Sequence, residues 1–182
     1  MSRITHRRRG PTRERAAVVG LAALLPAAAL AATEALGTYK AWTATRFDDD
    51  GKKACMMWAQ PELAEGQYQR RGEVWVFVTR RPAEQRFDRV SFELGYAFKP
   101  GAAAKVTVQG RADDASFELA THGSSAWVAR PDEGPVLVKA MKAGAKMVVE
   151  GQSARGTATR DTYSLMGFTK AHSVIARECA GS

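Results

Sequence analysis

Two cysteines, Cys55 and Cys179, are the residues best suited to a covalent link. In an oxidising compartment an even number of cysteines indicates pairing, and two cysteines permit one intramolecular bond. That bond would close a ring of 124 residues, for which the loop-closure argument gives about 5 kcal/mol as an upper value. The thiols could instead stay free or pair between molecules. A catalytic Cys55 is disfavoured, because no histidine lies near it in the sequence.

The histidines do not form a recognisable metal or catalytic pattern. His122 and His172 are 50 residues apart, whereas a zinc site needs three or four ligands at closer spacing. We therefore expect no metal and no cofactor. Ser164, His172 and Asp161 could be combined into a hydrolytic triad, but no nucleophile-elbow pattern surrounds the serine. A small hydrolase is thus an alternative, and a non-enzymatic protein is the expectation.

Two arginine pairs, Arg70-Arg71 and Arg80-Arg81, bracket an apolar run. They are candidates for contact with an anionic surface such as phospholipid or lipopolysaccharide head groups. Solvated strand ends are the competing interpretation.

Four tryptophans, Trp42, Trp58, Trp75 and Trp127, could line a ligand groove. Core packing is the default for aromatic residues at alternating strand positions. Trp127 differs, because "SSAW" is typical of the junction between a loop and a strand. It is therefore the tryptophan predicted to contact a partner.

Strand patterns that would position these residues dominate from residue 39 to about 120. "TYKAWTATRF", "ACMMWAQ", "EVWVFVTR", "RVSFELGYAF", "AKVTVQG" and "ASFELATHG" are predicted strands. "EVWVFVTR" has apolar residues on both faces, so we expect a central strand covered on both sides. The segment "PELAEGQYQRRG" is predicted to be a loop.

The pattern changes after Trp127. "GPVLVKAMKAG" fits a short helix with Pro135 in its first turn and Gly144 at its C-terminal cap. Residues 145–165 indicate a hairpin that turns near Arg155-Gly156. In the segment that follows, Phe168, Ala171, Ile175 and Cys179 recur on one helical face. We therefore predict a mainly β protein, an antiparallel β-sandwich with two short helices in the C-terminal third.

The N-terminus indicates export. A basic segment precedes 18 uncharged residues, Ala16 to Thr33, and Ala29-Leu30-Ala31 resembles a cleavage site. We predict that residues 1–31 are a cleaved signal peptide and that residues 32–182 are a single domain, periplasmic or secreted, without a further membrane span. An uncleaved anchor is the alternative. Six arginines and one glutamate lie in residues 1–31, so cleavage lowers the net charge from +8 to +3 and removes the support for nucleic-acid binding.

The order of several short motifs resembles the invasion-associated locus B family, exported proteins mainly of alphaproteobacteria. The motifs are the Trp42 strand, the Cys55 strand, "RRGEVWVFVTRRP", "GYAFKPG", "SSAWVA", "LVKAMKAGAKMVVEG" and "YSLMGFTKA". The resemblance covers roughly residues 39–180. Some members carry another cysteine just after the tryptophan strand, where this chain has Thr43-Ala44-Thr45.

The resemblance implies a β-sandwich-like domain outside the cytoplasm without known enzymatic activity. Some members are linked to entry into host cells. We therefore expect an exported domain that binds a protein or surface partner, with an envelope lipid or polysaccharide binder as the alternative.

Overall fold

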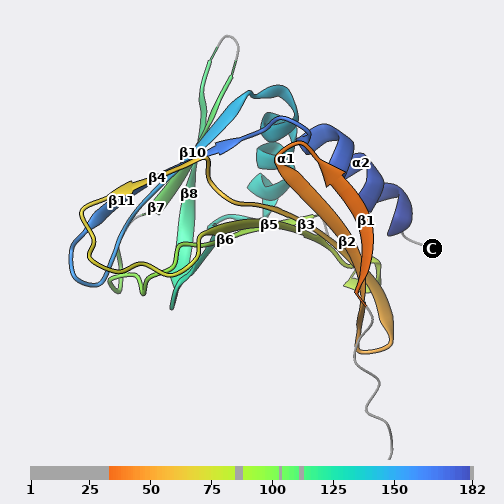
Figure 1. Ribbon diagram of the computed structural model, residues 1–182, viewed down its shortest axis with the longest axis horizontal. Coiled ribbons are helices and arrows are strands. Elements are labelled where there is room, and N and C mark those ends of the chain that lie inside the picture. Colours follow the sequence, from red (N-terminus) through yellow and green to blue (C-terminus); the bar gives the residue numbers. More distant parts are fainter. Residues whose placement is uncertain (1–32, 85–87, 103, 111–112, 181–182) are drawn as a thin grey trace, which may run out of the picture.

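The computed structural model describes residues 33–84, 88–102, 104–110 and 113–180. The predicted signal peptide lies outside these residues. The described chain forms an antiparallel sheet of 11 strands in the order β1-β2-β3-β5-β6-β9-β8-β7-β10-β11-β4 (Figure 1). Two helices lie in the C-terminal third of the chain. The sheet and these helices together confirm the predicted mainly β fold. The sheet is sandwich-like and does not close.

Most elements match alternating or helical patterns in the sequence. The strands are β1 (Glu34–Tyr39), β2 (Trp42–Asp49), β3 (Lys52–Ala59), β4 (Leu63–Gly66), β5 (Trp75–Arg80), β6 (Arg89–Glu93), β7 (Ala104–Gln109), β8 (Ala115–His122), β9 (Ser125–Val128), β10 (Lys146–Gln152) and β11 (Ala158–Ser164). The helices are α1 (Gly134–Ala143) and α2 (Phe168–Glu178). Pro135 lies in the first turn of α1 and Gly144 caps it, as predicted.

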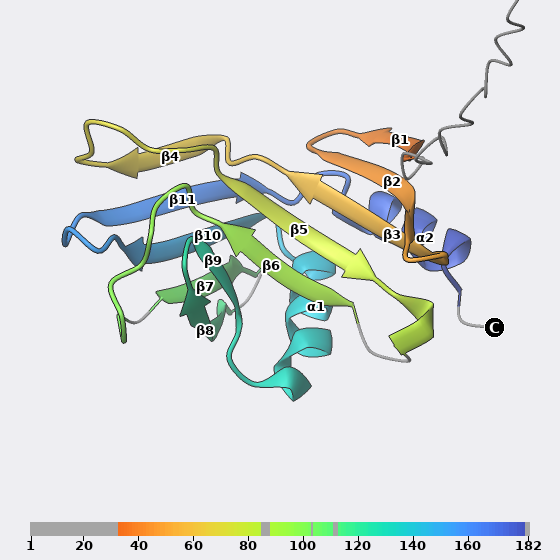
Figure 2. The ribbon, with the colours of Figure 1, turned by 90° about the horizontal axis from the view of Figure 1, so that it is seen from below.

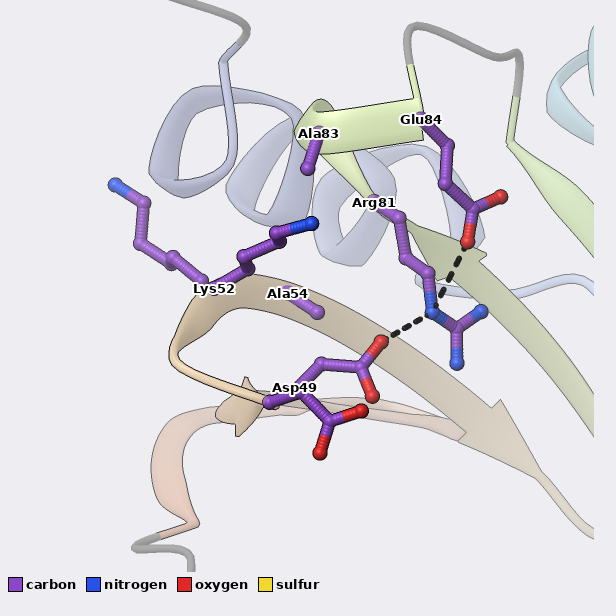
Figure 3. Close-up of a pocket in the computed structure, with 8 residues that line it drawn as sticks. Asp49, Lys52, Ala54, Arg81, Ala83 and Glu84 are labelled. Carbon is purple, nitrogen blue, oxygen red and sulfur yellow. Dashed lines mark hydrogen bonds and ion pairs between the residues drawn. The ribbon is translucent and has the colours of Figure 1, made fainter.

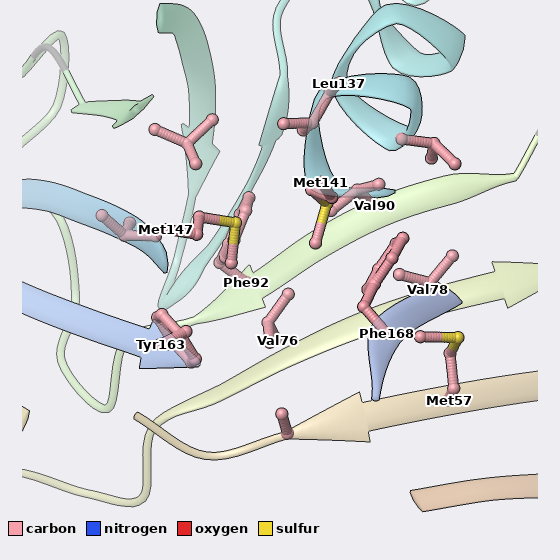
Figure 4. Packing of buried hydrophobic residues seen from close by; sticks show 14 of the residues in the cluster. Met57, Val76, Val78, Val90, Phe92, Leu137, Met141, Met147, Tyr163 and Phe168 are labelled. Atoms are coloured by element: carbon pink, nitrogen blue, oxygen red, sulfur yellow. The ribbon is translucent and has the colours of Figure 1, made fainter. Parts of the chain in front are cut away.

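The two helices pack on one face of the sheet, which we call the inner face. Alternating residues of the strands point inward and are buried with residues of both helices. Figure 4 shows this core: Phe92 and Met147 lie close to Met141 of α1, and Met57 lies close to Phe168 of α2. Figure 2 shows β3, β5 and β6 from the opposite side, with the helices behind them. That opposite side is the outer face of the sheet.

Helix α2 is fixed to the sheet at both ends. Its buried residues include Phe168, Ala171 and Ile175, the face predicted from the sequence. At its N-terminus Gly167 has φ of 90°, and a Cβ atom there would lie 1.8 Å from the carbonyl oxygen of Tyr39. Only glycine allows this close approach of the helix to the β1–β2 turn.

Two strand predictions and one loop prediction were wrong in detail. "TYKAWTATRF" is not one strand: it contains the end of β1, a turn with Lys40 at φ of 56°, and most of β2. β6 ends at Glu93 because Gly95 turns the chain at φ of 67°. β4 lies inside the segment predicted to be a loop, and its exposed residues contain no alternation that could have shown it.

Candidate interaction surface

The structure separates the four tryptophans into two groups. Trp42 lies in the core, where its indole N–H donates to the carbonyl oxygen of Ser164 at 3.0 Å and its ring packs edge-on against Phe168. The other three lie on the outer face with Phe77. We call Trp58, Trp75, Phe77 and Trp127 the outer aromatic face.

The outer aromatic face follows from strand pairing. Trp58 of β3 is opposite Phe77 of β5, and Ser91 of β6 is opposite both Phe77 and Trp127 of β9. Paired residues point to the same side of a sheet, so these side chains form one row across four strands. Trp75 stacks beside Phe77, with ring centroids 6.3 Å apart.

This face is open to solvent, which corrects the expectation that β5 is covered on both sides. Val76 and Val78 are fully buried inward, whereas Trp75 and Phe77 are half-buried. No helix of the described chain packs on the outer face. Trp127 is 39% exposed, in agreement with its predicted surface position. Exposed aromatic clusters of this kind are typical of binding surfaces.

Arg71 is a structural residue rather than part of a basic surface. Its guanidinium binds both carboxylate oxygens of Asp161, at 2.7 and 2.5 Å, and donates through Nε to the carbonyl oxygen of Leu94 at 2.7 Å. The side chains of Arg71 and Asp161 are 4% and 0% exposed. Tyr68 and Tyr96 lie against the guanidinium, 5.4 and 5.1 Å from its central carbon. The pair ties the segment before β5 to β11.

Burial and ion pairing shift the pKa values of Asp161 and Arg71 in opposite directions. Burial raises the pKa of Asp161, and the hydrogen bonds and charge of Arg71 partly offset that shift. Burial also disfavours the charged form of Arg71, but Asp161 outweighs it and raises the pKa of the guanidinium. Each charge therefore depends on the other.

Arg80 forms a second cluster with the buried side chains of Asp88 and His172. Arg80 binds Asp88 through Nε at 2.7 Å and through Nη2 at 3.0 Å. The Nε2 atom of His172 lies 2.6 Å from the second carboxylate oxygen of Asp88. The cluster connects β5 and the residue before β6 to helix α2. Asp161 binds Arg71, whereas His172 binds Asp88. The hydrolytic triad of Ser164, His172 and Asp161 that the sequence allowed is therefore not present.

The environment of Asp88 should make the free energy of unfolding sensitive to acid. Burial alone would raise its pKa, but hydrogen bonds from His172 and Arg80 outweigh burial and lower it from 3.8 to about 2. The folded state therefore binds this proton less readily than the unfolded chain does. The resulting stabilisation is complete above the ordinary pKa and is lost as pH falls from about 4 to about 2. We expect this loss to be about 2 kcal/mol.

Unfolding by urea at several pH values measures this loss. The D88N variant is the control, because its amide cannot titrate. The wild-type protein should lose about 2 kcal/mol more than D88N between pH 4 and pH 2. Equal losses in both proteins would show that Asp88 does not carry the effect.

Arg81 lines a shallow depression beside the β2–β3 turn (Figure 3). The depression has a volume of about 170 Å³. Arg81 binds Asp49 at 2.5 Å and lies 3.6 Å from Glu84. The charged lining residues are three acids and three bases, namely Asp49, Asp50, Glu84, Lys52, Lys53 and Arg81. The depression therefore carries no excess charge that would attract an anion.

The four arginines do not form one basic surface. Arg70 is exposed and has no ion-pair partner among the residues with described positions, but the other three guanidinium groups bind carboxylates. The sequence could not show this, because Asp161, Asp88 and Asp49 are distant in the chain from the arginines they bind. The geometry favours the interpretation of charged strand ends over that of an anionic-surface contact.

The disulfide predicted from the sequence is present. Cys55 of β3 and Cys179 at the end of α2 are bonded, with their Cα atoms 6.0 Å apart. Both residues are buried. The bond holds the C-terminal end of α2 on the inner face, next to the strand that contains Trp58.

Within the described ranges, nothing resembles a metal centre or a membrane-spanning helix. No group of three or more His, Cys, Asp or Glu side chains gathers there as a metal site would require. Neither described helix is long and apolar enough to cross a membrane.

The fold and its surface define a disulfide-linked antiparallel β domain with an aromatic face left open to solvent. The family model of the invasion associated locus B (IalB) protein matches residues 42–176. The chain belongs to this family. The search of curated proteins found no match.

A solved structure supports the fold. The crystal structure of invasion associated protein B from Bartonella henselae has a TM-score of 0.54 and 20% sequence identity. The similarity covers 78% of this chain and 96% of that chain. At this identity the match supports a shared fold.

Proposed function

We propose that this protein is an exported, non-enzymatic domain that acts by binding a partner through the outer aromatic face. The observation that carries the proposal is the row of half-buried and exposed aromatic side chains on a sheet face that no helix of the described residues covers. Burial of such rings supplies most of the binding energy at many interfaces. A partner on the bacterial envelope or on a host surface fits the family to which the chain belongs.

Export is supported by three observations. The sequence begins with the features of a signal peptide, both cysteines are oxidised, and the chain belongs to a family named for invasion. Disulfides persist mainly outside the reducing cytoplasm. We propose that residues 1–31 are removed and that the rest is periplasmic or secreted.

A binding role is also favoured over hydrolysis. His172 and Asp161, two members of the hydrolytic triad considered from the sequence, are buried and bound to different partners, Asp88 and Arg71. Each pair connects distant segments of the fold, which is a structural role.

Site-specific photo-crosslinking tests the proposed function. The photoreactive p-benzoylphenylalanine replaces Trp127 in cells that export the protein, and Val136 of α1 or Met166 as controls. The controls are 53% and 62% exposed and lie away from the outer aromatic face. We expect specific adducts from position 127 that are absent from positions 136 and 166. Adducts from the control positions alone would contradict the proposal, and so would a lack of adducts at position 127.

A further inference from the structure

The polar residues between the aromatic rings indicate which chemistry the outer aromatic face recognises. Two parallel rows of side chains cross the sheet. The first contains Thr43, Trp58, Phe77, Ser91, Trp127 and Ala120, and the second contains Trp75, Glu93, Ser125 and His122. Large rings thus lie next to hydroxyl groups and one carboxylate. A purely apolar protein interface would not require this mixture.

Trp127 projects from the first row. Its cross-strand neighbours are Ser91 on β6 and Ala120 on β8, and neither side chain is large enough to cover an indole. Two strand spacings separate Trp127 from Phe77, which corresponds to about 10 Å. The two rings therefore border a position whose floor is the small hydroxyl side chain of Ser91.

Glu93 provides a fixed acceptor beside Trp127. Its carboxylate accepts hydrogen bonds from the hydroxyl groups of Ser124, at 2.8 Å, and of Ser125. Glu93 is diagonal to Trp127 on adjacent strands, a separation of about 7–8 Å. A ring stacked on the indole would direct the hydroxyl groups at its edge toward this carboxylate. Sugar rings have this geometry, with C–H groups on their faces and hydroxyl groups around their edges.

The two rows carry little charge. Glu93 is the one Asp, Glu, Lys or Arg side chain in them. The next row of the outer face adds an exposed cation, Arg89, which lies opposite Thr79. An acidic ligand on the two rows would meet the carboxylate of Glu93. The low charge of the two rows thus favours an uncharged ligand.

We propose that the outer aromatic face binds a neutral polysaccharide, with one sugar ring stacked on Trp127 and its hydroxyl groups hydrogen-bonded to Glu93. This inference rests on the proposed function and specifies the class of partner. A protein or a second copy of the chain bound at this face is an alternative that the experiments below distinguish.

Affinity electrophoresis in native gels tests the ligand class. The gels contain hydroxyethylcellulose, galactomannan or dextran as neutral polymers, and alginate as an acidic polymer. We expect at least one neutral polymer to slow the migration of the wild-type protein and alginate to have no effect. The inference is overturned if no neutral polymer slows migration or if alginate alone does so.

Variants locate the binding site. W127A and E93Q should weaken binding at least tenfold, and W127F should retain part of it because a ring remains. The control M166A removes an exposed apolar side chain elsewhere and should bind as the wild type does. Thermal unfolding confirms that each variant is folded. Unchanged binding by W127A would overturn the inference.

The two proposals can fail separately. Benzophenone inserts into C–H bonds of proteins and glycans, so adducts at position 127 form with either partner. If proteases digest the crosslinked partner to a peptide, and the protein binds no neutral polymer, the partner is a protein. That result would support the proposed function and overturn the polysaccharide inference. An adduct with a second copy of the chain would assign the face to a homodimer and would also overturn the polysaccharide inference.

Discussion

Replacing both Cys55 and Cys179 by alanine is expected to lower the free energy of unfolding by up to about 5 kcal/mol. The bond closes a ring of 124 residues, which strongly restricts the unfolded chain. Alanine also removes two buried sulfur atoms from the contact between β3 and α2. Guanidinium unfolding of the wild type and of C55A/C179A measures the difference.

A reductant serves as the control for this prediction. Dithiothreitol should destabilise the wild-type protein toward the value of the double variant and should leave the variant unchanged, because the described chain contains no other cysteine. Amide exchange should accelerate first in α2, whose C-terminal end the bond anchors. A loss below about 1 kcal/mol would mean that the bond adds little to the packing of α2.

Replacing Arg71 by methionine is expected to cost about 3–5 kcal/mol of unfolding free energy. The change leaves the carboxylate of Asp161 buried without its partner, and removing one member of a buried ion pair usually costs this much. Thermal and urea unfolding measure the effect. It should exceed the effect of R70M, because Arg70 is exposed and makes no ion pair with a described residue.

A double variant distinguishes loss of the pair from loss of packing. R71M/D161L replaces both charges by apolar groups of similar size and should recover most of the stability lost in R71M. The Y163F variant is a second control. The hydroxyl of Tyr163 is buried and finds no hydrogen-bond partner in the part of the chain with known positions, so its removal should cost little. If R71M/D161L is as unstable as R71M, the packing around Tyr68 and Tyr96 carries the effect instead.

The elements that follow Trp127 could be predicted well, because their signals are local. Pro135 and Gly144 mark the ends of α1, the 3.6-residue period marks α2, and Gly156 marks the hairpin turn. Cysteine pairing was also predictable, since two cysteines in an oxidising compartment leave one intramolecular choice.

The strand ends were less predictable, because distant contacts determine them. "GYAF" continues the alternation of β6, yet the chain turns at Gly95, where a Cβ atom would lie 2.3 Å from the carbonyl oxygen of Gly72. Nothing near Gly95 in the sequence signals that contact. β4 is a strand because it pairs with β11, almost one hundred residues later.

The candidate surface was partly predictable. Trp127 was singled out from its local sequence, but Trp75 and Phe77 have the pattern of a core strand. Alternation shows which residues share a face and does not show whether another layer covers that face. The roles of Arg71 and Arg80 were missed for a similar reason, since their carboxylate partners come from other segments of the chain.

The disulfide also has a consequence for the order of events during biosynthesis. Cys55 leaves the ribosome early, whereas Cys179 follows every strand and α1. Oxidation of this pair therefore requires that all eleven strands of the described chain have already emerged. A chain interrupted between Cys55 and Cys179 keeps an unpaired thiol at Cys55, and that thiol would distinguish an incomplete product from a finished one.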